Sequence, residues 1–208
     1  MKFLNNINSE LLDILNPYMD WFFSQEDINN LPVEENRING HTIDSCCTES
    51  YLKEVMRPEH KGIPEVACVS NLELNMKIPK HHREKSKEIC DQLVRFLGAK
   101  FNAVHVFYPK GGFMGWHNNW DCPGYNILIN YHPEGDGWFK YWDAPNENIV
   151  TMYDPEGWSA KVGYYGGKNE SEEHHFWHCA GSHSHRQTFV FVIPDKNMWE
   201  MMCEDISS

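Results

Sequence analysis

Hydrophobic residues recur along the chain with two different periods, and the change falls near residue 100. Apolar residues in 9–23 follow a near-helical spacing, which predicts a covering helix that Pro17 should kink or divide. Segment 80–97 carries an apolar stripe among charged residues, and Gly98 stands where a C-terminal cap is expected, so a second helix is predicted there. Segment 41–54 has an ambiguous pattern.

Beyond Gly98 the pattern is that of short strands separated by glycine and proline turns. Strands are predicted at 101–108, 125–131, 138–142, 149–153, 160–165 and 188–193. This spacing is typical of a sandwich or jelly roll, so we expect a mainly β fold with flanking helices. The acidic tail after Pro194 is expected to form one helical turn or two.

The length of 208 residues suits a single domain. We expect residues 1–100 to be a helical or irregular support, 101–194 the β core and 195–208 a tail. Aromatic residues make up 13% of the chain, and large rings favour strands and pocket walls.

Charge and cysteine content narrow the class of protein. The formal net charge of -12 disfavours a nucleic-acid partner, because phosphates attract basic patches. Seven cysteines, with Cys46 and Cys47 adjacent, suggest no disulfide framework, and a reducing cytosol is the simplest assumption. The N-terminus lacks a signal-peptide apolar core, and no run approaches the roughly 20 apolar residues that span a bilayer. We therefore expect a soluble, cytoplasmic protein.

Two polar clusters carry the candidate chemistry. The first is Gly-Trp-His117-Asn-Asn119-Trp-Asp121, and the second is Trp-His178 followed by Arg186-Gln-Thr188. A ferrous oxygenase needs two imidazoles and one oxygen ligand on one face of the metal. A guanidinium suits a carboxylate because it donates two parallel hydrogen bonds. Because an unpaired buried charge is costly, Arg186 in an apolar strand requires a carboxylate partner.

The order of these features resembles the double-stranded β-helix core of Fe(II)/2-oxoglutarate-dependent oxygenases, especially the prolyl-hydroxylase-like members. The resemblance covers residues 101–194, and the first hundred residues match nothing. It implies Fe(II), 2-oxoglutarate as cosubstrate and ascorbate as an optional addition. It also implies that His117 and His178 bind the metal and that Arg186, Thr188 and Tyr108 bind the cosubstrate.

Position 119 departs from the family pattern, which has a carboxylate two residues after the first histidine. An asparagine oxygen is neutral and a weaker ligand. Three outcomes stay open: Asn119 binds the metal through its oxygen, Asp121 supplies the third ligand, or an exogenous ligand fills the position, as in the family's halogenases.

The predicted activity is hydroxylation of a C–H bond in a protein side chain or a small amino-acid-like substrate. The iron loop also resembles that of AlkB-type nucleic-acid demethylases, with Asp121 at the second acidic position, but the net acidity weighs against this substrate. The alternative from another class is a noncatalytic double-stranded β-helix that binds a ligand or protein, its iron site degraded at Asn119.

The other histidines near His178 and two tryptophans near His117 have alternative interpretations. A zinc or nickel cluster is conceivable among five histidines, His174, His175, His178, His183 and His185. The histidines other than His178 are expected at exposed loop positions. Trp116 and Trp120 flank the iron loop, so one of them is a candidate for the substrate mouth, while packing is the ordinary role of both.

Overall fold

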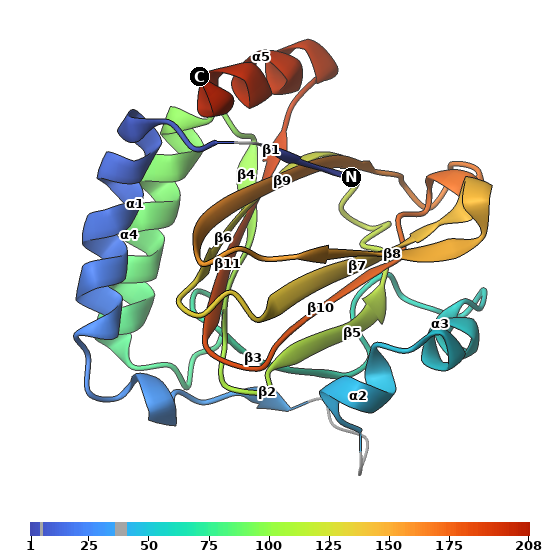
Figure 1. Ribbon diagram of the computed structural model, residues 1–208, viewed down its shortest axis with the longest axis horizontal. Helices are drawn as coiled ribbons and strands as arrows, with labels where there is room; N and C mark the ends of the chain where they lie inside the picture. The colour runs from blue at the N-terminus through green and yellow to red at the C-terminus, as the bar shows by residue number, and fades with distance from the viewer. Residues whose placement is uncertain (5, 36–40) are drawn as a thin grey trace.

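Two facing antiparallel sheets form the body of the molecule (Figure 1). The computed structural model describes residues 1–4, 6–35 and 41–208. The body is built from consecutive strands, which are β4 (Phe101–Tyr108), β5 (Phe113–His117), β6 (Gly124–His132), β7 (Gly137–Asp143), β8 (Asn148–Tyr153), β9 (Gly157–Tyr165), β10 (His178–Ser182) and β11 (Arg186–Ile193).

The strand order defines the topology. One sheet runs β9-β6-β11-β4 and the other runs β8-β7-β10-β5, with every pair antiparallel. Apart from β7 and β8, which pair directly with each other, strands that are neighbours in sequence lie in opposite sheets, which is the arrangement of a double-stranded β-helix, or jelly roll. This confirms the predicted fold class.

Three further strands come from the described part of the first hundred residues, which is 1–4, 6–35 and 41–100. Strand β1 (Lys2–Leu4) pairs with the outer edge of β9, and β2 (Glu34–Glu35) pairs with β3 (Ala67–Asn71). Strand β3 also pairs with both β4 and β5 and so joins the two sheets along one side. The N-terminal part is thus more than a helical or irregular support, because it extends the sheets.

Helices α1 (Ser9–Phe23) and α4 (Lys80–Phe96) lie side by side against the outer face of the β4–β11–β6–β9 sheet (Figure 1). Helix α1 passes through the exposed Pro17 as a single element, so the expected division does not occur. Gly98 adopts the left-handed φ of 58° after α4, as its capping position predicts. The buried residues of both helices pack on apolar residues of the sheet and form the main core, which includes Leu11, Leu15, Phe22, Ile89, Leu93, Phe107, Ile127 and Phe189.

Short helices complete the structure. The ambiguous segment 41–54 contains α2 (Ile43–Cys46) and most of α3 (Glu49–Val55), and both helices pack against β5. The C-terminal tail is a longer helix than expected, α5 (Lys196–Ser207), which begins at the capping side chain of Asp195. Three 3-10 turns are η1 (Ile28–Asn30), η2 (Ala144–Asn146) and η3 (Glu172–His174).

Strands β5 and β10 were not predicted from the sequence, although each carries a candidate metal ligand at its end. His117 is the last residue of β5 and His178 is the first residue of β10. Strand β10 consists mostly of small residues, and Gly181 in it packs under Trp138, whose ring a Cβ there would approach to 2.6 Å. Such a strand has no apolar alternation for sequence analysis to detect.

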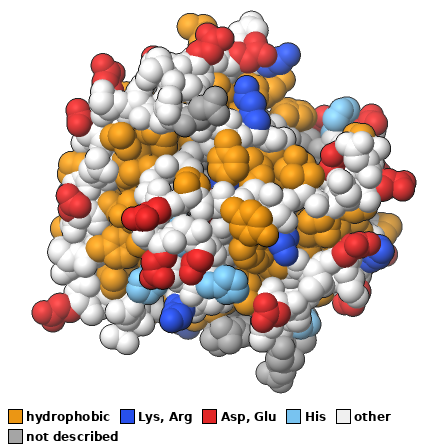
Figure 2. Space-filling view, viewed as in Figure 1, with side chains coloured by type: hydrophobic (Ala, Val, Ile, Leu, Met, Phe, Trp, Pro, Cys, Tyr) orange, Lys and Arg blue, Asp and Glu red, His pale blue; other side chains and the backbone are white. Residues whose placement is uncertain are grey.

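Charge and apolar surface are distributed without a dominant patch on the face shown in Figure 2. Acidic side chains lie mainly around the rim, and apolar side chains gather over the helical layer and near the centre. Among the described residues, six cysteines are thiols outside any disulfide bond, namely Cys46, Cys47, Cys90, Cys122, Cys179 and Cys203. Within the described residues, none of the helices combines the length and apolar character needed to cross a bilayer.

Candidate functional site

A cavity of about 470 Å³ lies between the two sheets. This volume is within the usual range of small-molecule sites. Its walls are mainly apolar, with residues such as Val69, Val106, Leu128 and Val190. Seven residues that the sequence singled out all line it, namely Tyr108, His117, Asn119, Asp121, His178, Arg186 and Thr188.

The two candidate imidazoles face each other across neighbouring strands. His117 and His178 are register partners of β5 and β10, and their ring centroids are 4.1 Å apart. His117 Nδ1 lies 2.8 Å from the Gly115 carbonyl oxygen, and His178 Nδ1 lies 2.7 Å from that of Phe176. Since a carbonyl only accepts, each Nδ1 carries the proton. Both Nε2 atoms therefore present a lone pair, which is the form that binds a metal.

Burial keeps these imidazoles neutral. Each side chain is only 4% exposed. Burial lowers the pKa of His117 to about 4 and lowers the pKa of His178 well below its ordinary value, with the neighbouring His117 adding to the shift in His178. Both imidazoles are thus neutral near pH 7, with no proton on Nε2.

Asn119 lies beside this pair. Its Nδ2 is 3.3 Å from His178 Nε2, so the amide donates toward the imidazole lone pair. The residue has a left-handed φ of 53°, a conformation that asparagine adopts more readily than most residues. The side chain is in position to contact anything bound at His178 Nε2.

Asp121, the other expected oxygen ligand, also lines the cavity but is exposed. Among the described residues, the one set of three His, Cys, Asp or Glu ligand atoms within 4.8 Å of one another is Asp27, His81 and His82. Asp121 therefore does not join His117 and His178 in such a set.

A short turn that the sequence analysis did not single out holds Asn119 in place. The Gly62 carbonyl accepts hydrogen bonds from the backbone N–H groups of Asn118 and Asn119, at 3.2 and 2.7 Å. The Gly62 N–H in turn donates to Nδ1 of the buried His60 at 2.9 Å. Gly62 has φ +86°, and a Cβ there would lie 2.5 Å from the Trp120 ring, so only glycine fits.

The charged end of the cavity is built around Arg186. This guanidinium is 1% exposed, and it lies 4.8 Å from the ring centroid of Tyr108, its partner across β4 and β11. Its Nε donates to Asp154 at 2.7 Å, one terminal nitrogen donates to Asn130 at 2.8 Å, and the other donates to the Thr188 hydroxyl. Asp154 is thus the carboxylate partner that the sequence analysis required for Arg186.

Asp154 is shared by two cations. Its second oxygen accepts from Lys161, which is fully buried. Burial alone raises the pKa of Asp154, but the charges of Arg186 and Lys161 outweigh it and lower that pKa to about 2. Burial lowers the pKa of Lys161 to about 8, so the amine still carries its charge at neutral pH. Two cations and one carboxylate leave one buried positive charge beside the cavity.

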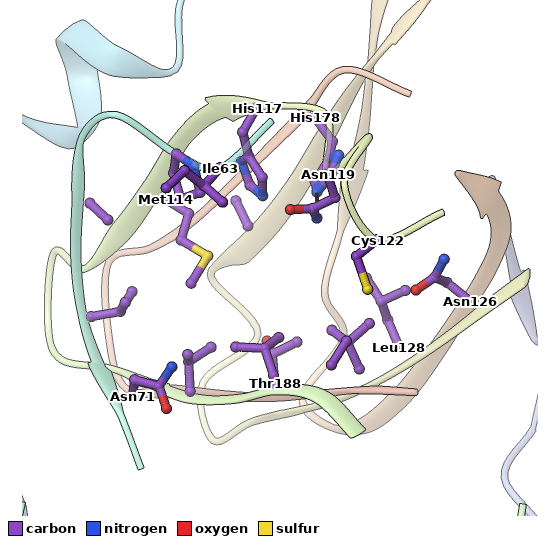
Figure 3. A pocket seen from close by; sticks show the side chains of 18 of the residues that line it. Ile63, Asn71, Met114, His117, Asn119, Cys122, Asn126, Leu128, His178 and Thr188 are labelled. Carbon is purple, nitrogen blue, oxygen red and sulfur yellow. Dashed lines mark hydrogen bonds between the residues drawn. The ribbon is translucent and has the colours of Figure 1, made fainter. Parts of the chain in front are cut away.

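A further unpaired donor lies next to this charge. Asn130 is fully buried, and its Nδ2 has no hydrogen-bond partner among the residues that the structure describes. Its Oδ1 accepts from both Arg186 and Thr188. In the close-up view, Thr188 lies on the wall opposite His117, His178 and Asn119 (Figure 3). The cavity therefore has a neutral nitrogen-rich end and an electropositive end.

The other residues considered from the sequence have ordinary positions. Trp116 is fully buried and donates to the Thr48 carbonyl, and neither it nor Trp120 lines the cavity. His174 and His183 are exposed, and the remaining loop histidines, His175 and His185, are half-buried. No three members of that predicted cluster bring ligand atoms within 4.8 Å of one another in the described part of the chain.

Comparisons with known proteins leave the family open. No family model and no curated protein matches the chain. A solved structure of a Pseudomonas putida prolyl-4-hydroxylase is similar over 65% of this chain and 73% of that chain, with a TM-score of 0.35 and 13% identity. So loose a likeness identifies neither a family nor an activity.

Proposed function

We propose that this protein is an Fe(II)- and 2-oxoglutarate-dependent dioxygenase that hydroxylates a C–H bond of a protein side chain or a small amino-acid-like substrate. One observation carries the proposal. One cavity has two neutral imidazoles with unprotonated Nε2 atoms at one end and an excess of buried positive charge at the other.

The nitrogen-rich end suits Fe(II). His117 and His178 would hold the metal through Nε2, because their Nδ1 protons are committed to backbone carbonyls. A half-turn of the Asn119 amide would direct its oxygen, instead of its nitrogen, toward the same point, and this gives the two-histidine, one-oxygen donor set of non-heme iron sites. The asparagine is neutral, so binding should be weaker than with a carboxylate.

The electropositive end suits one carboxylate of 2-oxoglutarate. The net positive charge of the Arg186–Asp154–Lys161 group, the Thr188 hydroxyl and the unpaired Asn130 amide would stabilise an anion there. Bound together, the metal and cosubstrate would activate dioxygen, which is the oxidant for C–H hydroxylation and for the decarboxylation of 2-oxoglutarate to succinate. The protein positions both and, through its apolar walls, keeps water from the reacting atoms.

The test is an anaerobic titration of the purified protein with Fe(II) and 2-oxoglutarate. We expect a weak visible charge-transfer band that is absent from His178→Ala and retained by the matched control His183→Ala, which changes an exposed histidine outside the cavity. With oxygen present, succinate should form above the His178→Ala background, with substrate added where turnover requires it. Absence of both signals would reject the oxygenase and favour the binding module.

Asn119→Asp separates these two functions further. A carboxylate at this position should tighten Fe(II) binding, because it replaces a neutral ligand with an anionic one. The hydrogen bond between Asn119 and His178 is the observation that favours a noncatalytic module, since it occupies the imidazole lone pair. If Asn119→Asp leaves metal affinity unchanged, position 119 does not face the metal.

A further inference from the structure

A second group of metal-binding residue types lies outside the cavity, at the amino end of α4. His81 and His82 occupy the first turn of α4, and Asp27 immediately precedes η1. In Figure 1 the start of α4 and the turn after α1 lie at the same end of the helical pair. One ligand atom from each of these residues lies within 4.8 Å of the other two.

Both imidazoles lie against the Asp27 carboxylate. His82 Nε2 lies 2.8 Å from Asp27 Oδ1, and His81 Nε2 lies 3.5 Å from Asp27 Oδ2. The two imidazole centroids are 4.3 Å apart. The side chain of His82 is 1% exposed, whereas those of Asp27 and His81 are 39% and 51% exposed. The inner side of the group is therefore formed by the buried His82, and Asp27 and His81 form a side that is open to solvent.

The surroundings hold the buried imidazole in its orientation. The rings of Trp21 and Phe22 pack on His82 with centroid distances of 5.4 and 5.5 Å. In the described part of the chain, the ion-pair partners of Asp27 are the two histidines, with no lysine or arginine bound to it. A metal ion bound here would therefore replace protons shared between the carboxylate and the imidazoles, and would not compete with a lysine or arginine.

We propose that Asp27, His81 and His82 form a binding site for a divalent transition-metal ion such as Zn²⁺, separate from the cavity. Two imidazoles and one carboxylate are ligands that Zn²⁺ accepts, and three protein ligands leave a position for water on the exposed side. The positive end of the α4 dipole opposes a cation, but Asp27 offsets that charge. Metal binding there fixes the segment before η1 onto the start of α4.

The experiment uses the full chain carrying His178→Ala, which removes the proposed iron site, so its result does not depend on the proposed function. Zn²⁺ is titrated calorimetrically, and Co²⁺ is titrated with visible absorption as a readout of nitrogen and oxygen coordination. We expect one equivalent of either ion to bind. Adding His81→Ala or Asp27→Asn should weaken binding by more than the roughly 10- to 100-fold that loss of a supporting partner causes.

The matched control is His174→Ala on the same background, because it also removes one exposed histidine. It should leave the affinity unchanged. His81 is half exposed, so its replacement should preserve the fold, and the unfolding midpoint without metal checks this. Bound Cu²⁺ should quench the fluorescence of Trp21. Loss of this quenching in Trp21→Phe would place the ion beside that indole. No binding on the His178→Ala background, or equal binding after His81→Ala and Asp27→Asn, overturns the proposal.

Discussion

The two ends of the cavity differ in how much of their structure the protein completes by itself. At the electropositive end, Arg186 has partners on all three of its nitrogens, and Asp154 binds two cations. At the nitrogen-rich end, His117 and His178 each hydrogen-bond to a backbone carbonyl through Nδ1, and one amide contacts the Nε2 of His178. One end is therefore set by folding, while the other is left open for an added ligand.

This difference has an energetic consequence. A buried ion group must be satisfied internally or the fold is destabilised, so the charged end is coupled to stability. Neutral imidazoles need no charged partner to be stable in the interior. Substitutions at the nitrogen-rich end can therefore change ligand binding with little effect on folding stability. Substitutions at the two ends should accordingly separate into effects on unfolding and effects on metal affinity.

Asp154→Ala should give the largest effect. It leaves Lys161 and Arg186 buried without their shared carboxylate, and breaking a buried ion pair in this way costs about 3–5 kcal/mol. Urea unfolding at neutral pH measures the loss. Asp13→Ala removes a carboxylate from an exposed position of α1 and should change the free energy of unfolding very little. Equal effects of the two substitutions would contradict the claimed role of Asp154.

The pH dependence of stability sharpens the same point. The folded pKa of Asp154, about 2, lies below its ordinary value of 3.8, so its contribution is present above about pH 4 and is lost as the pH falls toward 2. The shift corresponds to about 2 kcal/mol. Unfolding measured between pH 5 and 2.5 should show the gap between the wild type and Asp154→Asn narrowing. A gap independent of pH would argue against an ionised Asp154.

His60→Ala tests how the nitrogen-rich end of the cavity is supported. Losing the acceptor of the Gly62 N–H should loosen the turn that fixes Asn119, and we expect Fe(II) affinity to fall on the order of tenfold, the lower end for supporting partners of metal ligands. His60→Asn retains an acceptor oxygen near the Nδ1 position and should recover much of the affinity. His183→Ala serves as the control. Unchanged affinity in His60→Ala would show that Asn119 does not depend on this turn.

Thr188→Val should have the smallest effect. The substitution keeps the shape of the side chain but removes the hydroxyl that accepts from Arg186 and donates to Asn130 at 3.0 Å. Each net hydrogen bond contributes about 1 kcal/mol, so losing both should lower the free energy of unfolding by about 1–2 kcal/mol. Metal binding without cosubstrate should not change. A loss as large as that of Asp154→Ala would mean that Thr188, and not the carboxylate, stabilises the guanidinium.

The sequence predicted the gathering of candidate residues better than it predicted their partners. The order of strands and polar clusters was enough to expect His117, His178 and Arg186 around one cavity, and they do line one, although their roles stay predictions. Asp154 and Lys161 were missed because a single polar residue after or within a strand has no pattern that marks it as buried. They lie only seven residues apart in the chain, and their importance arises from the ion pair of Asp154 with Arg186, which comes from the later strand β11.

Local backbone chemistry explains the remaining differences. Gly98 was found because a capping glycine follows directly from helix periodicity. Gly62 was not, since the Trp120 ring that forbids a side chain there is distant in sequence. Strand β10 escaped detection because small residues replace the apolar alternation on which strand prediction depends, and β5 escaped because Gly115 interrupts its short apolar run.

The three residues of β1 protect both a sheet edge and a buried charge. They cover the free edge of β9, and the Phe3 ring lies 4.7 Å from the Lys161 amine. A deletion or fusion that displaced this strand would leave a row of unpaired backbone groups ready to join another molecule. The same change would admit water to the buried ion pairs of Asp154 with Lys161 and Arg186 and weaken them, so self-association and loosening of the guanidinium would arise together.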